Sequence, residues 1–230
     1  MKVPAMEVMG LIFLVTISVF VRTGEAETKS FLINCGTNSS ANVDGRKWVG
    51  DFAPDNNLTL SSVGIEAAST VAFSGDSIFA SLYKTARIFT DSLNYTFRAN
   101  QGNYFLRLHF HPFSFQNYNV NDSSFDVMAN GLKLVSEFNV PGEISHKNSI
   151  SQSSESNSSS LPLVKEYFLA IDLDVIVIEF NPTKGSFGFV NAIELVPVVN
   201  TLFVDTVSRV GGNGANSFLN VSKRGIRNHV

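Results

Sequence analysis

Apolar and polar residues alternate one by one along several stretches of this chain. In Tyr104–Phe110, every second residue from Tyr104 onward is large and apolar, whereas Arg107 and His109 occupy the positions between them. A period of two residues places successive side chains on opposite faces of an extended strand. Pro112, which has no N–H for a neighbouring strand, follows shortly afterwards. The stretch is therefore predicted to be a half-buried strand.

The same alternation surrounds Asn130-Gly131, in Phe125–Ala129 and Leu132–Phe138. Both turn residues tolerate the positive φ of a type I′ turn, so this region is predicted to form a hairpin. Further strands are expected at Ser30–Asn34, Lys47–Val49, Ala86–Thr90, Tyr95–Arg98, Lys165–Ile171, Val175–Phe180 and Phe187–Val196. No segment repeats the i, i+3, i+4, i+7 spacing of a long amphipathic helix. The pattern predicts an all-β fold, an antiparallel β-sandwich or jelly roll.

The first residues follow a different pattern. Lys2 precedes the apolar run Met9–Val21, and the small residues of Gly24-Glu25-Ala26 come after it. This order is typical of a secretory signal peptide, so residues 1–26 are expected to be removed. The apolar run is also too short to cross a membrane comfortably, and no later segment is long and apolar enough to do so. The protein is therefore expected to be secreted.

The rest of the chain divides into one domain and a tail. Residues 27–198 hold all the predicted strands and are expected to form the sandwich. Residues 199–230 include Gly211-Gly212-Asn213-Gly214 and are expected to be a linker or the incomplete start of a second unit. Within the domain, Ser145–Ser160 is rich in Ser, Asn and Gln, and it is expected to be a mobile surface loop.

Composition adds information on redox state, modification and partners. Cys35 is the only cysteine, and its apolar neighbours predict a buried thiol, with an intermolecular disulfide as the alternative. The net charge is −3 and no block of Lys or Arg occurs, so nucleic acid is not an expected partner. Six acceptor sequons are the predicted glycosylation sites. They are Asn38, Asn57, Asn94, Asn121, Asn157 and Asn220.

Motifs of common enzyme classes are missing from the sequence. It has no G-x-S-x-G nucleophile elbow, no H-R-D catalytic loop and no D-F-G metal motif. A pair of carboxylates for glycoside hydrolysis remains an open alternative, because the separation of such a pair depends on the three-dimensional fold, but Glu179 and Glu194 are expected on outward-facing strand positions. We therefore expect a protein without catalytic activity and without a cofactor.

His109 and His111 raise the alternative of a cupin-like metalloenzyme. An H-x-H pair on a strand places both imidazoles on one face, where they could bind one metal ion. Cupin sites add a carboxylate three or four residues further on, but Ser114 and Phe115 occupy those positions here. The simpler hypothesis is that both histidines are polar residues on the exposed or loop-facing side, with no metal bound.

Seven stretches, taken together and in order, match a known family. They are Phe31–Gly36, Val43–Arg46, Ala86–Thr90, Tyr95–Phe97, Phe105–Phe110, Phe125–Val127 and Phe187–Leu195. Over roughly residues 29–198, the chain resembles the malectin-like ectodomains of the plant receptor-like kinases named after Catharanthus roseus. The resemblance implies a jelly-roll-like sandwich related to the animal lectin malectin. In that family two such units precede a transmembrane helix and a kinase, whereas this chain has one complete unit and no kinase.

The resemblance also implies partners and a place of action. The expected ligand is a cell-wall glycan, or a secreted peptide or GPI-anchored protein. The expected location is the apoplast, or the cell surface if the chain is part of a longer receptor. A soluble decoy or structural interaction module is a further alternative.

Lectin sites place aromatic rings against the apolar faces of sugars. Animal malectin presents a Tyr-Phe pair after the strand that resembles Tyr104–Phe110, and Ser114 and Phe115 occupy those positions here. Loop aromatics near this end of the sandwich are therefore the candidate ligand-binding residues. They are Tyr83, Phe89, Phe113, Phe115 and Tyr118.

Overall fold

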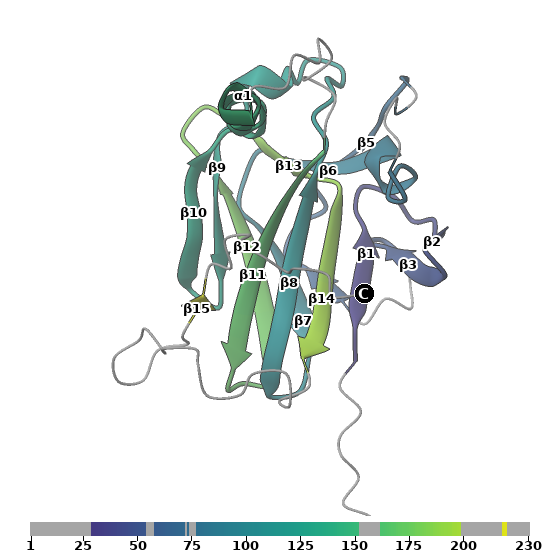
Figure 1. Cartoon of the computed structure of the whole chain (residues 1–230), viewed down its shortest axis with the longest axis vertical. Coiled ribbons are helices and arrows are strands. Elements are labelled where there is room, and N and C mark those ends of the chain that lie inside the picture. Colours follow the sequence, from purple (N-terminus) through teal and green to yellow (C-terminus); the bar gives the residue numbers. More distant parts are fainter. Residues whose placement is uncertain are drawn as a thin grey trace, which may run out of the picture.

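The computed structural model describes residues 29–53, 58–71, 73, 77–151, 162–198 and 218–219. The predicted fold class is confirmed, because these residues form mostly antiparallel strands arranged in packed sheets (Figure 1). The predicted signal peptide (1–26) lies outside the described residues, as does all of the predicted linker (199–230) except residues 218–219. Among the described residues, none of the helices has the length and apolar character needed to cross a membrane.

A seven-stranded sheet forms one layer of the sandwich. In spatial order its strands are β15 (Phe218–Leu219), β11 (Leu163–Ile171), β8 (Gly102–Phe110), β14 (Ala192–Val198), β1 (Phe31–Asn34), β3 (Arg46–Gly50) and β2 (Ala41–Val43). Neighbouring strands are antiparallel except β1 and β3, which run parallel. The central strand β8 ends at Phe110, and this end of the sheet leads to the candidate loop.

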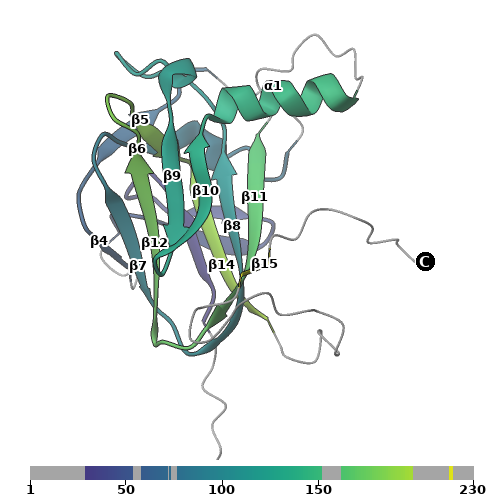
Figure 2. The same cartoon turned by 90° about the vertical axis from the view of Figure 1, so that its left-hand side faces the viewer.

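A five-stranded and a three-stranded sheet complete the sandwich, and Figure 2 shows the five-stranded sheet beside the seven-stranded layer. The larger contains β10 (Leu132–Phe138), β9 (Phe125–Ala129), β12 (Val175–Pro182), β7 (Leu93–Arg98) and β4 (Leu58–Leu60). The smaller contains β13 (Gly188–Val190), β6 (Thr85–Phe89) and β5 (Ile65–Ala68). The helices are α1 (Val140–Ser151) and the short 3₁₀ turns η1 (Leu82–Lys84) and η2 (Val120–Asp122).

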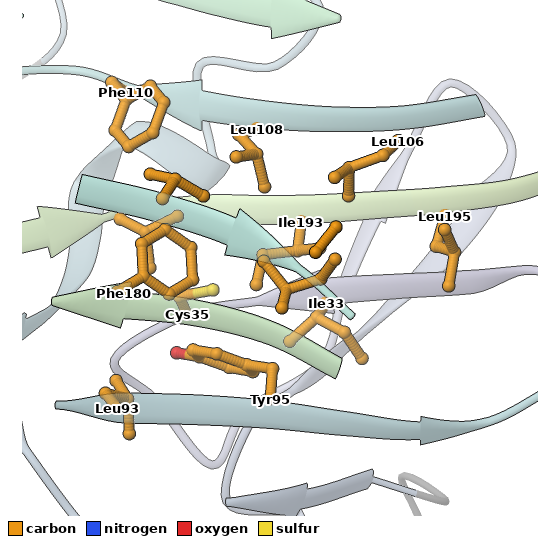
Figure 3. Close-up of a cluster of buried hydrophobic side chains, with 14 of the residues drawn as sticks. Ile33, Cys35, Leu93, Tyr95, Leu106, Leu108, Phe110, Phe180, Ile193 and Leu195 are labelled. Atoms are coloured by element: carbon orange, nitrogen blue, oxygen red, sulfur yellow. The ribbon is translucent and has the colours of Figure 1, made fainter. Parts of the chain in front are cut away.

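The alternation on β8 produces the core as predicted. Its apolar set, which includes Leu106 and Leu108, is fully buried and faces Tyr95 and Phe180 of the five-stranded sheet (Figure 3). The predicted hairpin is also confirmed, because Asn130 and Gly131 have φ values of 45° and 82° between β9 and β10. Two positive φ angles are what a type I′ turn requires.

Cys35 lies inside this core, as predicted. Its thiol is fully buried beside Tyr95, and burial, reinforced by the charge of Asp51, raises its pKa well above the ordinary value. Thiolate formation is therefore disfavoured, and a disulfide to another chain has no access to the sulfur in this conformation.

The expectation of a loop at Ser145–Ser160 is wrong over Ser145–Ser151, which belongs to α1. The helix begins because the Asn139 side-chain oxygen accepts the N–H of Gly142 at 2.7 Å. Val140 and Ile144, one turn apart, are buried in the core. Two apolar residues give too weak a period to recognise in a Ser-rich sequence. Residues 152–160 lie outside the described part of the chain.

The predicted strand Phe187–Val196 is divided in two at Asn191. The part before Asn191 is β13 of the three-stranded sheet, and the part after it is β14 of the seven-stranded sheet. The Asn191 N–H donates to the His109 carbonyl at 3.0 Å, and its own carbonyl accepts from Cys35 at 2.9 Å. At this residue the chain therefore leaves the three-stranded sheet and joins β8 and the end of β1 in the seven-stranded sheet.

Glu194 faces outward on β14, as the alternation predicted, but it is not exposed. It forms ion pairs with Arg46 on β3 and with Arg107 on β8, the latter at 3.3 Å, and is only 1% exposed. The two guanidinium groups cover it, and Arg107 also pairs with Glu166 on β11 at 2.7 Å. Glu194 is therefore committed to a structural ion-pair network.

Candidate functional site

Three of the five predicted aromatic residues gather on one loop after β8. Phe113, Phe115 and Tyr118 are half-buried, and each packs against the hydrophobic core with part of its ring. We call residues 111–119 the aromatic loop. Phe115 and Tyr118 exchange two backbone hydrogen bonds, of 2.9 and 3.2 Å, around Gln116, whose φ is 50°. This tight turn pairs the backbones of the two aromatic residues.

Neighbouring segments fix the far end of the aromatic loop. The Tyr118 ring meets the Phe187 ring edge-on with centroids 5.1 Å apart. The Asn139 side-chain amide donates to the carbonyls of Asn121 and Ser123 at 3.1 and 2.6 Å, and so joins η2, which directly follows the loop, to the start of α1. Rigid support of this kind lets a loop present rings in one geometry, which lowers the entropic cost of binding.

Asn191 fixes the near end of the aromatic loop. Its side-chain oxygen accepts the backbone N–H of His111 at 2.7 Å, and its amide donates to the Thr85 carbonyl at 2.7 Å. The loop therefore leaves β8 at a position defined by both β14 and β6. Neither Asn191 nor Phe187 was predicted as a site residue, because about 70 residues separate each from the loop and no local pattern links them.

The expectation that His109 and His111 face solvent or a loop is wrong. Their exposed fractions are 1% and 7%. The His109 ring lies between Trp48 and Phe79, with centroid distances of 5.8 and 5.1 Å. Aromatic residues from distant parts of the sequence cover this end of β8, so the outward positions of the strand become a second, smaller core.

Tyr83 lies against both histidines and is 1% exposed. Its hydroxyl is 3.2 Å from His109 Nδ1, and its ring centroid is 5.6 Å from that of His111. Burial raises the pKa of Tyr83 to about 12, lowers the pKa of His109 to about 4 and also lowers the pKa of His111. Near neutral pH all three side chains are therefore uncharged.

The metal hypothesis gains no third ligand from this arrangement. Within the described ranges, no group of three or more His, Cys, Asp or Glu side chains is placed to hold a metal ion. Phe89, another predicted site residue, is also separate from the loop surface. It is 1% exposed and packs on Phe125 and Phe180 with centroid distances of 5.5 and 5.3 Å. Phe89 and Tyr83 are therefore buried and cannot touch an external ligand in this conformation.

The aromatic loop carries no formal charge. Residues 111–121 contain no Asp, Glu, Lys or Arg, and the low pKa of His111 keeps that residue neutral. Exposed Gln116, Asn117 and Asn119 provide amide donors and acceptors beside the rings. Half-exposed rings next to amides can stack on the apolar face of a sugar while bonding its hydroxyls.

Three of the six predicted glycosylation sites lie among the described residues. Asn38 and Asn121 are exposed, in the turn after β1 and in η2. Asn94 is half-buried on β7, and its side-chain oxygen is buried without a hydrogen-bond partner. Asn57, Asn157 and Asn220 lie outside the described residues.

Comparisons with known proteins place this geometry in context. A family model for the malectin domain matches residues 29–193. A probable receptor-like protein kinase from Arabidopsis thaliana is 50% identical over 204 residues, which are 88% of this chain and 24% of that protein. The Arabidopsis thaliana receptor-like protein kinase HERK 1 is 30% identical over 226 residues, covering 98% of this chain and 24% of that protein. The chain thus spans about a quarter of the length of these relatives.

Solved structures agree with the sequence relatives. The extracellular domain of ANXUR2 from Arabidopsis thaliana aligns with a TM-score of 0.65 and 30% identity, covering 82% of this chain and 46% of that one. The extracellular domain of ANXUR1 from the same plant gives a TM-score of 0.64 and 28% identity, with the same coverage. Both neighbours are extracellular portions of larger proteins.

Proposed function

This chain belongs to the malectin domain family, and we propose that it binds plant cell-wall carbohydrate through the aromatic loop. Its relatives are Catharanthus roseus-type receptor-like kinases, so the resemblance found in the sequence is confirmed. The chain is a malectin-like ectodomain unit, which implies extracellular recognition at or near the cell surface. We also propose that the chain contributes to receptor signalling, since its relatives are receptor-like protein kinases. This role is a proposal because the chain spans only about a quarter of the length of those relatives.

One observation carries the carbohydrate proposal. Phe113, Phe115 and Tyr118 keep part of their rings exposed on a single uncharged loop that is held by Asn191, at the start of β14, and by Phe187. Partly exposed rings on a fixed support suit the flat apolar faces of sugars. The absence of charge on residues 111–121 favours neutral oligosaccharides over uronic acid polymers.

Isothermal titration calorimetry with the purified secreted chain tests this proposal. The probes are oligosaccharides of cellulose, xyloglucan and polygalacturonate. Binding to a neutral oligosaccharide is expected, and Phe115→Ala should weaken it by about 1–2 kcal/mol, or roughly 5- to 30-fold, through lost ring contact.

Leu173→Ala is the matched control. Leu173 is an equally apolar side chain, 50% exposed, between β11 and β12 at the opposite end of the sandwich. This control should bind like the unchanged protein. If folded Phe115→Ala also binds normally, the aromatic loop is not the site. If none of the oligosaccharides binds, the carbohydrate proposal fails, and a protein partner becomes the next hypothesis to test.

A further inference from the structure

The two buried histidines of β8 occupy an unusual position in this fold. They lie on the outward face of the strand, yet aromatic residues cover them completely. His111 is also the first residue of the aromatic loop. Any change in the packing of these imidazoles would therefore be transmitted directly to Pro112 and Phe113.

Hydrogen bonding around the imidazoles is incomplete. His109 has one nitrogen near the Tyr83 hydroxyl, but its Nε2 is buried without a partner. His111 Nδ1 and Trp48 Nε1 are likewise buried and without partners. An unsatisfied buried polar atom costs free energy, so each of these groups would gain by contact with water.

A short segment covers the histidines. We call Ser77–Lys84, which ends in η1, the η1 segment. Its Phe79 ring centroid lies 5.1 Å from that of His109, and its Leu82 and Tyr83 side chains are buried. The cover is therefore held on β8 largely by apolar and aromatic contact, together with the Tyr83–His109 hydrogen bond.

Carboxylates near the histidines are already engaged. The negative charges of Glu194 on β14 and Glu166 on β11 favour a protonated His109 and so act to raise its pKa. Both carboxylates already pair with Arg107, however, and Glu194 also pairs with Arg46. The positive charges of Arg107 and Arg46 oppose a further positive charge at His109. Around His111, the described ring contacts come from Phe73 and Tyr83, and burial alone lowers its pKa.

We propose that His109 and His111 form an acid-sensitive joint, in which protonation releases the η1 segment from β8 and loosens the aromatic loop. A charged imidazole gains hydration when the cover opens, whereas it stays unpaired when the cover is closed. The pKa of His109, about 4 in the closed state, supports this direction. Only the effect on ligand binding rests on the proposed function, because the joint itself needs no ligand.

The size of the effect follows from the two pKa values of His109. A solvated histidine has a pKa near 6.5, whereas His109 in the closed state has a pKa of about 4. In a solvated histidine the ratio of protonated to neutral imidazole is about 0.3 at pH 7 and about 30 at pH 5, whereas in the closed state that ratio for His109 is only about 0.1 at pH 5. The opening equilibrium of the η1 segment should therefore rise about 20-fold between pH 7 and pH 5.

Hydrogen exchange of the full chain tests the joint. After correction for intrinsic exchange rates, protection of the Ser77–Lys84 amides should fall about 20-fold between pH 7 and pH 5. Protection of the β9–β10 hairpin should stay constant, which separates local opening from global unfolding. In His109→Gln the fall should shrink strongly, whereas His146→Gln, an exposed site on α1, should leave it unchanged. Equal protection at both pH values in the unchanged chain would overturn the proposal.

A second measurement does not depend on a variant that folds. NMR of the histidine-labelled chain follows each imidazole directly. His109 should titrate well below 6.5 and His111 below 6.5, while the η1 segment signals shift with them. Titration of both near 6.5 without any change in that segment would also overturn the proposal. Oligosaccharide binding at pH 7 and pH 5 then tests the link to function separately. Absence of binding at pH 7 would count against the carbohydrate proposal and leave the joint intact.

Discussion

The carboxylate of Asp51 joins three parts of the chain that are distant in sequence. It accepts the backbone N–H groups of Gly36 at 3.0 Å and Thr37 at 3.3 Å. It also accepts Nε of Arg87 at 3.0 Å and Nη2 at 2.5 Å, and the Tyr95 hydroxyl at 3.0 Å. The side chains of Asp51 and Arg87 are both 0% exposed. We predict that this buried ion pair is the polar interaction to which the fold is most sensitive.

The substitution Asp51→Asn preserves shape while removing the charge. It leaves buried Arg87 with only the 56% exposed Glu66, at 4.0 Å, as a carboxylate partner, and it places an amide donor where five donors converge. Burial opposes the charge on Arg87, but hydrogen bonding and attraction to Asp51 outweigh it and raise the pKa of Arg87. Breaking a buried pair by removing one partner typically costs about 3–5 kcal/mol. Domains are stable by only about 5–15 kcal/mol, so this loss is a large fraction of the total.

Urea denaturation measures the effect, with fluorescence of Trp48 as the probe, since Trp48 is the only tryptophan and is fully buried. The control is Lys133→Met, which removes an ion pair to Asp126 between side chains that are 51% and 23% exposed. That change should cost less than about 1 kcal/mol. The double variant Asp51→Asn with Arg87→Met should recover part of the loss. If Asp51→Asn costs no more than the control, charge compensation at Arg87 is not what stabilises this region.

Three further predictions rest on local geometry. Gly36→Ala should lower the melting temperature by several degrees more than Gly45→Ala, because both have φ near +70° but only at Gly36 would the added Cβ lie 2.0 Å from the Ala86 carbonyl oxygen. Stability should fall by up to about 3 kcal/mol as the pH drops from 6.5 to 4, because the folded state holds the pKa of His109 at about 4, and urea titrations of His109→Gln should lose most of this fall. Peptide mapping of the secreted protein should find a glycan on the exposed Asn38, and its absence from the plant-expressed protein would refute that site.

The long strands could be predicted from sequence because their period is a local property. The alternation of β8 and the Asn130-Gly131 turn need no knowledge of distant residues. By contrast, β4 and β5 contain three and four residues, too few for a period to stand out. Their conformation depends on pairing with β7 and β6, respectively, which are contacts that the sequence pattern does not contain.

The candidate site likewise has features that the sequence could predict and features that depend on tertiary contacts. The aromatic loop could be predicted because its rings follow a strand that Pro112 ends. The roles of Asn191 and Phe187 could not be predicted, because both residues lie between β12 and β14 and reach the loop only through tertiary contacts. The burial of Tyr83 could not be predicted either, because it depends on β8 lying beneath η1.

Alternation along a strand predicts which face a side chain is on, but not whether that face is covered. Glu194 and His109 show the difference, because both point outward from the seven-stranded sheet and both are 1% exposed. Guanidinium groups cover the first and aromatic rings cover the second. Covered polar groups on an outward face depend on their partners for stability, so they are sensitive to charge in a way that exposed groups are not. The partly covered rings of Phe113 and Phe115 lie between these cases, and this intermediate burial is what makes the aromatic loop the better candidate for contact with a ligand.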